Sequence, residues 1–202
     1  MDTIAIIDFG GQYSHLIGRR IRETGVYAKV LPASVRREDL EKIDELKGIV
    51  FSGGAGSVYD DGAPFPQDGI FDMDIPFLGI CYGHQIIAHL SGGEVTKGDV
   101  GEYGTTDLSL VQDNSRLFNG FTGNEEVWMN HKDTVMSVPE NFSVLAKTSA
   151  SPVAAFASKK AGLYGVQFHP EVTHRQGYAC AEELRTKDLQ CQKGVGPGKY
   201  PR

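Results

Sequence analysis

Cys81 lies in a stretch whose residue types suit a nucleophile. The segment Gly79-Ile80-Cys81-Tyr82-Gly83 follows an apolar run and precedes residues with helical spacing. A strand that turns sharply into a helix through Gly-x-Cys-x-Gly holds its central residue strained and exposed, and small flanking residues keep the turn free of clashes. The N-terminus of the following helix favours the thiolate, which is the attacking species. The alternative is that Cys81 is a small buried apolar residue, as free cysteines commonly are.

A base for this nucleophile stands at the end of the last predicted strand, in residues 165–171, Gly-Val-Gln-Phe-His-Pro-Glu. In an extended segment, residues two apart point to the same side. His169 and Glu171 are therefore expected side by side, with Pro170 fixing the backbone between them. A carboxylate beside an imidazole orients the ring and stabilises the imidazolium that forms after proton transfer. The alternative is a loop histidine that is hydrogen-bonded in a turn.

A glycine-rich loop, residues 51–57, has the sequence Phe-Ser-Gly-Gly-Ala-Gly-Ser. Glycines directly after a strand let backbone N–H groups point into a cleft, and together with the N–H of Tyr82 they could form an oxyanion hole. A phosphate cradle is a second interpretation. The ATP loop of pyrophosphatases also begins Ser-Gly-Gly, but it has Asp where this chain has Gly56. A tight loop without a ligand is the third interpretation.

The histidines do not predict a metal site. His84 and His89 are five residues apart, as are His169 and His174. On a helix this spacing does not place two ligands on one face, and no cysteine pair has zinc spacing. We therefore expect no metal in this chain.

The first half of the chain alternates predicted strands with predicted helices. Apolar, β-branched runs predict strands over residues 3–7, 26–31, 48–51 and 76–80. Helical spacing of apolar and charged residues predicts helices over residues 16–23, 36–46 and 83–90. This alternation predicts an α/β fold with a mostly parallel central sheet flanked by helices.

The second half is predicted to be rich in strands. Short strands are expected over residues 94–97, 106–111, 126–129, 142–147, 153–157 and 162–168, separated by turn residues. They are expected to extend the sheet and to add an antiparallel portion. The main domain is expected to span residues 1–175. Residues 176–202 form an atypical tail with a possible helix over 179–189 and a disordered end over 194–202.

Composition narrows the functional classes. The 202 residues, 40% hydrophobic and 23% charged, are typical of one globular domain. The net charge of −6 argues against a nucleic-acid partner. No apolar run reaches the ~20 residues of a membrane span, and the start lacks the features of a signal peptide. The three cysteines are an odd number, which argues against a disulfide framework and favours the reducing cytoplasm.

Together these motifs resemble the class I glutamine amidotransferases. The Cys81 elbow, the Gly53-Gly54 loop and His169-Pro170-Glu171 stand in the order that this family has. Within the family, further motifs are similar to the amidotransferase part of GMP synthases: Asp8-Phe9-Gly10-Gly11-Gln12-Tyr13, Arg19-Arg20-Ile21-Arg22-Glu23, Glu102-Tyr103-Gly104, Val127-Trp128-Met129-Asn130-His131-Lys132-Asp133 and Pro170-Glu171-Val172-Thr173-His174.

The resemblance implies a flavodoxin-like α/β fold and a role for each matched residue. It implies that Cys81, His169 and Glu171 form a catalytic triad. It implies that Gly54 and Tyr82 donate the oxyanion-hole amides. The residues implied to bind the substrate are Gly53, Gln85, Asn130, His131 and Asp133.

The resemblance also implies the reaction and the partner. It implies hydrolysis of glutamine to glutamate and ammonia, with the ammonia used to aminate XMP to GMP in an ATP-pyrophosphatase (synthetase) domain or subunit. No cofactor is then expected in this chain, and ATP and Mg²⁺ are expected only in the partner. Two alternatives stay open: the glutaminase of another amidotransferase, such as an anthranilate or aminodeoxychorismate synthase, or a catalytically silent docking module of the same fold.

Overall fold

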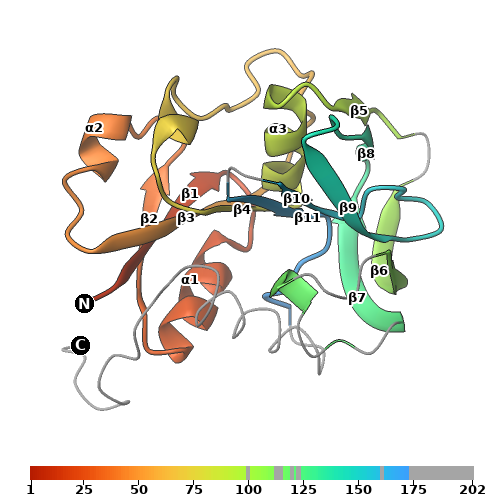
Figure 1. The fold of residues 1–202 in the computed structure, drawn as a ribbon, viewed down its shortest axis with the longest axis horizontal. Helices are drawn as coiled ribbons and strands as arrows, with labels where there is room; N and C mark the ends of the chain where they lie inside the picture. Colours follow the sequence, from red (N-terminus) through yellow and green to blue (C-terminus); the bar gives the residue numbers. More distant parts are fainter. Residues whose placement is uncertain (99–100, 112–115, 119–120, 122–123, 160–161, 173–202) are drawn as a thin grey trace.

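The computed structural model describes residues 1–98, 101–111, 116–118, 121, 124–159 and 162–172. Nine strands of this part form the central sheet: β1 (Thr3–Phe9), β2 (Tyr27–Pro32), β3 (Leu46–Gly54), β4 (Phe77–Ile80), β6 (Glu102–Leu110), β7 (Asn124–His131), β9 (Phe142–Lys147), β10 (Ala155–Ser158) and β11 (Leu163–Val166). Their order across the sheet is β2-β1-β3-β4-β11-β10-β9-β6-β7 (Figure 1).

The sheet has a parallel half and an antiparallel half. The pairs β2–β1, β1–β3, β3–β4 and β4–β11 are parallel. From β11 onward the pairs β11–β10, β10–β9, β9–β6 and β6–β7 are antiparallel. A separate two-stranded sheet joins β5 (Glu94–Thr96) to β8 (Thr134–Ser137). The predicted fold class, a mostly parallel sheet with an added antiparallel portion, is confirmed.

Helices cover both faces of the parallel half. The helical elements are α1 (Ser14–Glu23), α2 (Arg37–Leu40), α3 (Tyr82–Leu90) and the 3₁₀ turns η1 (Ile70–Asp72) and η2 (Arg116–Phe118). Figure 1 shows α1 on one side of the sheet and α3 on the other.

The alternation of side chains along β1 explains why both faces are covered. Ile4 and Ile6 pack in one buried cluster with Ile17 of α1. Ile7, which points to the opposite face, packs in a second cluster with Ile86 of α3. Because β1 lies inside the sheet with apolar side chains on both faces, each face needs a covering layer.

The helix predicted over residues 36–46 is wrong, because only α2 (Arg37–Leu40) forms. Glu45 adopts φ 54°, and its carbonyl accepts a hydrogen bond from the N–H of Thr3 at 2.9 Å. Leu46 then pairs with Thr3 as β3 begins. Pairing with β1 therefore overrides the helical propensity of this charged segment.

The antiparallel half differs from its prediction mainly at element boundaries. The strand predicted over residues 142–147 coincides with β9, whereas β6 begins at Glu102 rather than at residue 106. Strand β8 is not among the predicted strands. The predicted helix over residues 179–189 and the rest of the tail lie outside the described residues.

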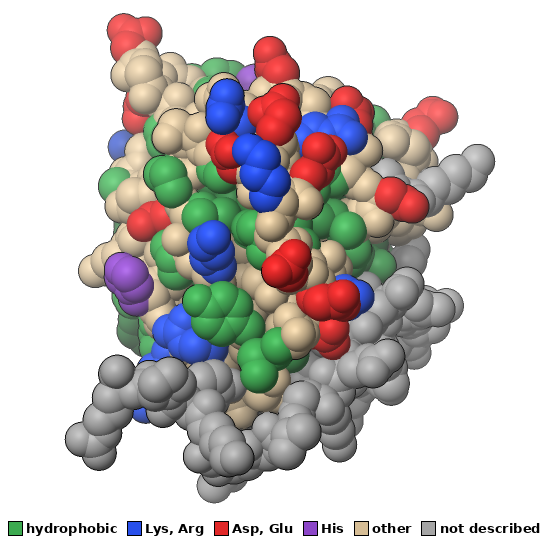
Figure 2. Space-filling view, turned by 90° about the vertical axis from the view of Figure 1, so that its left-hand side faces the viewer, with side chains coloured by type: hydrophobic (Ala, Val, Ile, Leu, Met, Phe, Trp, Pro, Cys, Tyr) green, Lys and Arg blue, Asp and Glu red, His purple; other side chains and the backbone are tan. Residues whose placement is uncertain are grey.

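The face beside α2 carries mixed charges. Figure 2 shows basic and acidic side chains interspersed there. On α2 they pair with one another, Arg36 with Asp39 at 3.1 Å and Arg37 with Glu41 at 2.7 Å. Surface pairs of this kind contribute little to stability, and their mixed signs leave no single-sign patch on α2 itself. In the described part of the chain, no helix has both the length and the apolar character to cross a bilayer.

Candidate active site

Cys81 lies where β4 meets α3, with φ 53° and ψ −104°, a conformation that residues other than glycine rarely adopt. Two glycines permit this turn. A Cβ on Gly79 would overlap the backbone of Gly83, and a Cβ on Gly83 would overlap the backbone of Phe51. The N–H of Cys81 donates to the carbonyl of Val166 at 2.9 Å. Since such a conformation costs about 1–3 kcal/mol, the packing of β3, β4, β11 and α3 must hold it in place.

The thiol of Cys81 faces a confined polar space. The residue is only 5% exposed, and it precedes the first turn of α3, where the helix dipole favours negative charge. Its sulfur lies 3.7 Å from the carbonyl oxygen of Asn130. The position suits a nucleophile better than a packing residue, because an apolar side chain would need no such strained turn.

His169 and Glu171 form a buried pair. Nδ1 of His169 donates to Oε1 of Glu171 at 2.7 Å, and the two residues are 4% and 3% exposed. The two side chains lie side by side as predicted, but the backbone that places them is not the predicted extended strand. Strand β11 ends at Val166, and the N–H of Val172 donates to the carbonyl of His169 at 3.2 Å. A turn, rather than an extended strand, therefore brings the imidazole and the carboxylate together.

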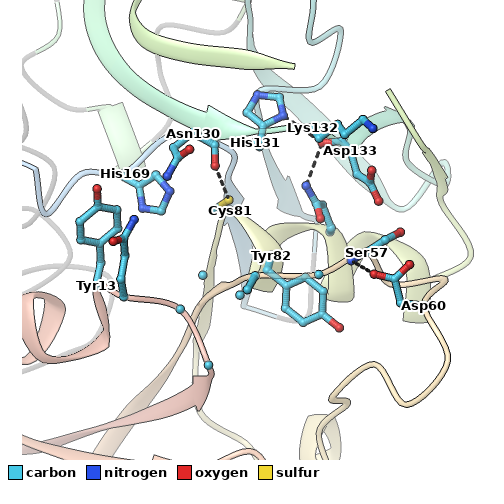
Figure 3. Close-up of a pocket in the computed structure, with 18 of the residues that line it drawn as sticks. Tyr13, Ser57, Asp60, Cys81, Tyr82, Asn130, His131, Lys132, Asp133 and His169 are labelled. Carbon is cyan, nitrogen blue, oxygen red and sulfur yellow. Dashed lines mark hydrogen bonds between the residues drawn. The ribbon is translucent and has the colours of Figure 1, made fainter. Parts of the chain in front are cut away.

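The imidazole of His169 lies beside the sulfur of Cys81 (Figure 3). A Cβ on Gly53 would lie 3.3 Å from Cε1 of His169 and 3.8 Å from Cβ of Cys81. Nε2 of His169 is buried and has no hydrogen-bond partner of ordinary length among the described residues. Burial alone would lower the pKa of His169, but Cys81 and Glu171 together raise it to about 10. This environment favours the imidazolium form of His169.

Two residues of α1 and its preceding loop support His169 and Glu171. The ring of Tyr13 packs edge-on against the ring of His169, with centroids 5.1 Å apart. Nε of Arg20 donates to the backbone carbonyl of Glu171 at 3.1 Å. Both residues belong to motifs that the sequence analysis noted without assigning a role. No local spacing signals these contacts, because the partners are far apart in the chain.

The glycines at the end of β3 are closely packed. A Cβ on Gly54 would lie 2.8 Å from the ring of Tyr82, and a Cβ on Gly11 would overlap the carbonyl of Gly53. These glycines therefore leave no room for side chains between β3, Gly11 and the ring of Tyr82. Tyr82 is the first residue of α3, so its N–H has no acceptor within the helix. Gly54 and Tyr82 line the same cavity as Cys81.

Three of the predicted substrate residues lie at the end of β7 or in the turn to β8: Asn130, His131 and Asp133. Nε2 of Gln85, from α3, donates to the backbone carbonyl of Asp133 at 2.9 Å. Nδ1 of His131 lies 2.9 Å from the same carbonyl. The carboxylate of Asp133 is buried, and its Oδ2 has no hydrogen-bond partner among the described residues. An unpartnered buried oxygen is costly, so this side chain is the strongest candidate to accept a cationic group.

All of these elements surround one cavity of about 540 Å³. Its volume is in the ordinary range for small-molecule sites. Every predicted site residue except Glu171 lines it, and Glu171 stands behind His169. Additional lining residues that the sequence analysis did not predict as site residues include Gln12, Tyr13, Lys97, Tyr103 and Lys132. Figure 3 shows Cys81 between His169 and the turn that holds Asp133.

Neither the second interpretation of the glycine loop nor a metal site gains support here. Gly53 lies near His169 and Cys81, Gly54 lies against Tyr82, and Gly56 lies near the carboxylate of Asp60, which would repel a phosphate. In the part of the chain that is described, no group of three or more His, Cys, Asp and Glu side chains could hold a metal ion. His84 is buried against Phe156 and its Nε2 bonds to the carbonyl of Val153, so it belongs to the core.

The family follows from comparison with known sequences. The sequence model of the family "Glutamine amidotransferase class-I" matches residues 5–182. The chain belongs to the class I glutamine amidotransferases. This amidotransferase is 47% identical over 175 residues to the GMP synthase [glutamine-hydrolyzing] of Clostridium perfringens, a match that covers 86% of this chain and 34% of that protein.

Other relatives of this amidotransferase agree. The GMP synthase [glutamine-hydrolyzing] of Debaryomyces hansenii is 46% identical over 181 residues, covering 87% of this chain and 33% of that protein. A crystal structure of a candidate GMP synthase subunit from Thermoplasma acidophilum superimposes with a TM-score of 0.81 and 34% identity, over 91% of this chain and 92% of that one. The amidotransferase thus spans about a third of the length of the curated relatives that it matches.

Proposed function

We propose that this amidotransferase hydrolyses glutamine to glutamate and ammonia, with Cys81 as the nucleophile. The observation that carries the proposal is the strained elbow that places the thiol beside the buried pair of His169 and Glu171. An activated cysteine, a base and an orienting carboxylate at one cavity form the arrangement expected for acyl transfer.

The first half of the reaction forms a thioester. His169 holds the proton of Cys81, and the thiolate attacks the carboxamide carbon of glutamine. The negative charge that develops on the carboxamide oxygen is stabilised by the N–H groups of Gly54 and Tyr82. As the C–N bond breaks, the imidazolium donates its Nε2 proton to the leaving nitrogen, which departs as ammonia. Glu171 orients the ring throughout through its bond to Nδ1.

The second half of the reaction releases glutamate. Neutral His169 takes a proton from water, and the resulting hydroxide attacks the thioester carbon. The C–S bond breaks, glutamate leaves, and Cys81 returns as the thiolate beside the imidazolium. No cofactor takes part in either half of this proposed cycle.

The turn at residues 130–133 is proposed to hold the amino-acid end of glutamine. The carboxylate of Asp133, whose Oδ2 has no hydrogen-bond partner among the described residues, accepts the α-ammonium group. Gln85 holds the backbone carbonyl of Asp133, and Gly53 leaves room for the substrate chain beside His169. Asn130 and His131 complete the wall opposite the elbow.

The ammonia is proposed to serve the amination of XMP to GMP. The relatives that match at 46–47% identity are named GMP synthases, and they are about three times as long as the matched region. We infer that an ATP-pyrophosphatase domain or subunit supplies the binding of ATP and Mg²⁺. The free buried thiol of Cys81 fits the reducing cytoplasm, which is the location that we propose. The domain boundary near residue 175 stays a prediction.

The experiment measures glutamate release by the purified chain, alone and with the synthetase part of a GMP synthase, ATP, Mg²⁺ and XMP. We expect glutamate release that Cys81→Ala abolishes, and GMP formation with glutamine as the nitrogen donor. The large component of anthranilate synthase serves as the control partner. With glutamine and this chain as the nitrogen source, it should form no anthranilate. Absence of glutamate release in every combination would identify a silent docking module instead.

A further inference from the structure

A buried carboxylate outside the cavity, that of Glu102, is not accounted for by the proposed chemistry. Glu102 is the first residue of β6 and pairs in register with His131, the last residue of β7. It is 9% exposed. Both of its oxygens accept hydrogen bonds: Oε1 from the hydroxyl of Thr148 at 2.7 Å, and Oε2 from the hydroxyl of Ser151 at 2.5 Å and from Nε2 of His131 at 3.1 Å. Burying a carboxylate is costly, so the three hydrogen bonds to Glu102 indicate that its position matters to the structure around it.

The contacts of Glu102 keep it ionised. Burial alone would raise the pKa of Glu102, but the hydrogen bonds from His131, Ser151 and Thr148 lower it below its ordinary value. A charged acceptor makes stronger hydrogen bonds than a neutral one. The orientation of the His131 ring is therefore firmly determined at its Nε2 end.

The other end of the His131 ring reaches the substrate turn. Its Nδ1 lies 2.9 Å from the backbone carbonyl of Asp133, which also accepts a hydrogen bond from Gln85. Two side chains thus contact one carbonyl, one from α3 and one from β7. With that carbonyl held, the carboxylate of Asp133 remains at the wall of the cavity. Glu102 itself does not line the cavity, so it acts on the site only through His131.

We propose that Glu102 is a positioning residue that orients His131, and through it the turn 130–133, so that the site binds the amino-acid end of glutamine. This inference rests on the proposed function and deepens it. It separates recognition of glutamine from the reactivity of the thiol, because Glu102 contacts neither Cys81 nor His169. Loss of its charge should weaken substrate binding and leave the nucleophile intact.

The first test compares Glu102→Gln with the parent chain. KM for glutamine should rise about tenfold, while kcat stays within about twofold. A glutamine-shaped chloroketone should alkylate Cys81 about tenfold more slowly, whereas iodoacetamide, which has no amino-acid end, should react at the parental rate. The matched control is Glu126→Gln, which removes a carboxylate from an exposed position on the adjacent strand β7 and should change none of these values.

The second test asks whether Glu102 acts through His131. In His131→Asn the amide can still donate toward the Asp133 carbonyl but cannot reach Glu102. In that background Glu102→Gln should add less than twofold to KM, because interacting residues are not additive. Should Glu102→Gln fail to fold, Thr148→Val removes one donor to the same carboxylate and should raise KM two- to threefold.

The outcomes separate this proposal from the proposed function. An unchanged KM in folded Glu102→Gln, equal slowing of both electrophiles, or fully additive effects with His131→Asn would overturn the positioning role while glutamine hydrolysis stands. A parent chain that releases no glutamate and reacts no faster with the chloroketone than with iodoacetamide would overturn the proposed function, and this proposal with it.

Discussion

The parallel and antiparallel halves of the sheet hold the cavity in different ways. On the parallel side, the elbow at Cys81 and the end of β3 at Gly54 pack so closely against their neighbours that a Cβ on the glycines there would overlap other atoms. On the antiparallel side, the turn that carries Asp133 is placed by buried polar side chains, Glu102 and His131 among them. Close packing around glycines thus holds the nucleophile in place, whereas buried hydrogen bonds hold the substrate turn.

This contrast has a kinetic consequence. Changes on the parallel side should alter the chemical step or the fold, since the reacting atoms are located there. Changes to the polar network should alter substrate binding instead. Four sets of variants test this division between the halves, in order of decreasing expected effect.

Replacement of the proposed base should have the largest effect. His169→Gln removes the group that takes the proton of Cys81 and returns it to the leaving nitrogen, so kcat should fall about a thousandfold. Steady-state glutamate release measures this change. For comparison, His131→Asn on the antiparallel side should raise KM and keep kcat within about threefold. Equal losses of kcat in the two variants would contradict the claim that the parallel half governs the chemical step and the antiparallel half governs substrate binding.

A methyl group at Gly83 should disrupt the elbow itself. Because the added Cβ would overlap the backbone of Phe51, Gly83→Ala should lower the free energy of unfolding by about 3 kcal/mol. Urea denaturation measures the loss. The control is Gly18→Ala in α1, whose Cβ would meet only side-chain atoms at 3.2 Å and 3.3 Å, and which should stay within about 1 kcal/mol of the parent. Equal stability of both variants would contradict the close-packed elbow.

Loss of the Glu171 carboxylate should have a smaller effect that depends on pH. Glu171→Gln removes one cause of the raised pKa of His169, which stands at about 10 against an ordinary value of 6.5. A raised folded-state pKa contributes stability in full below pH 6.5, and this contribution is lost as the pH rises through about 10. The parent should therefore exceed the variant in stability by more at pH 6 than at pH 10. If the stability difference between parent and variant grew as the pH rose, the proposed cause of the raised pKa of His169 would be contradicted.

The smallest effect is expected at Arg20. Arg20→Ala removes the hydrogen bond to the backbone carbonyl of Glu171, and kcat/KM should fall two- to fivefold, or about 0.5–1 kcal/mol. Arg19→Ala is the matched control. Arg19 pairs with the same Glu23 as Arg20 does and its side chain is 70% exposed, so the control should keep parental kinetics. An equal loss of kcat/KM in both variants would indicate that the ion pairs with Glu23, rather than the bond to the Glu171 carbonyl, cause the effect.

Local spacing is sufficient to predict some of these features. The elbow can be inferred because Gly79 and Gly83 act within the same turn as Cys81, and the neighbourhood of His169 and Glu171 because they stand two positions apart. The parallel sheet follows from alternating strands and helices. Strand β9 was predicted with its observed bounds.

Contacts across the fold could not be predicted in this way. Glu102 and His131 are 29 residues apart and meet only through the register of β6 and β7. Arg20 and Glu171 are 151 residues apart. The helix predicted over residues 36–46 failed for the same reason, since the turn at Glu45 depends on its bond to Thr3. In each case the deciding partner lies elsewhere in the chain.

The central claim is that Cys81 and Glu171 together favour the imidazolium form of His169. The most direct measurement is an NMR titration of the His169 ring in the parent and in Cys81→Ala. The parent should show a pKa of about 10, and the variant should show a clearly lower pKa, because burial lowers it and only Glu171 then opposes burial. The same pKa in both proteins would contradict the account.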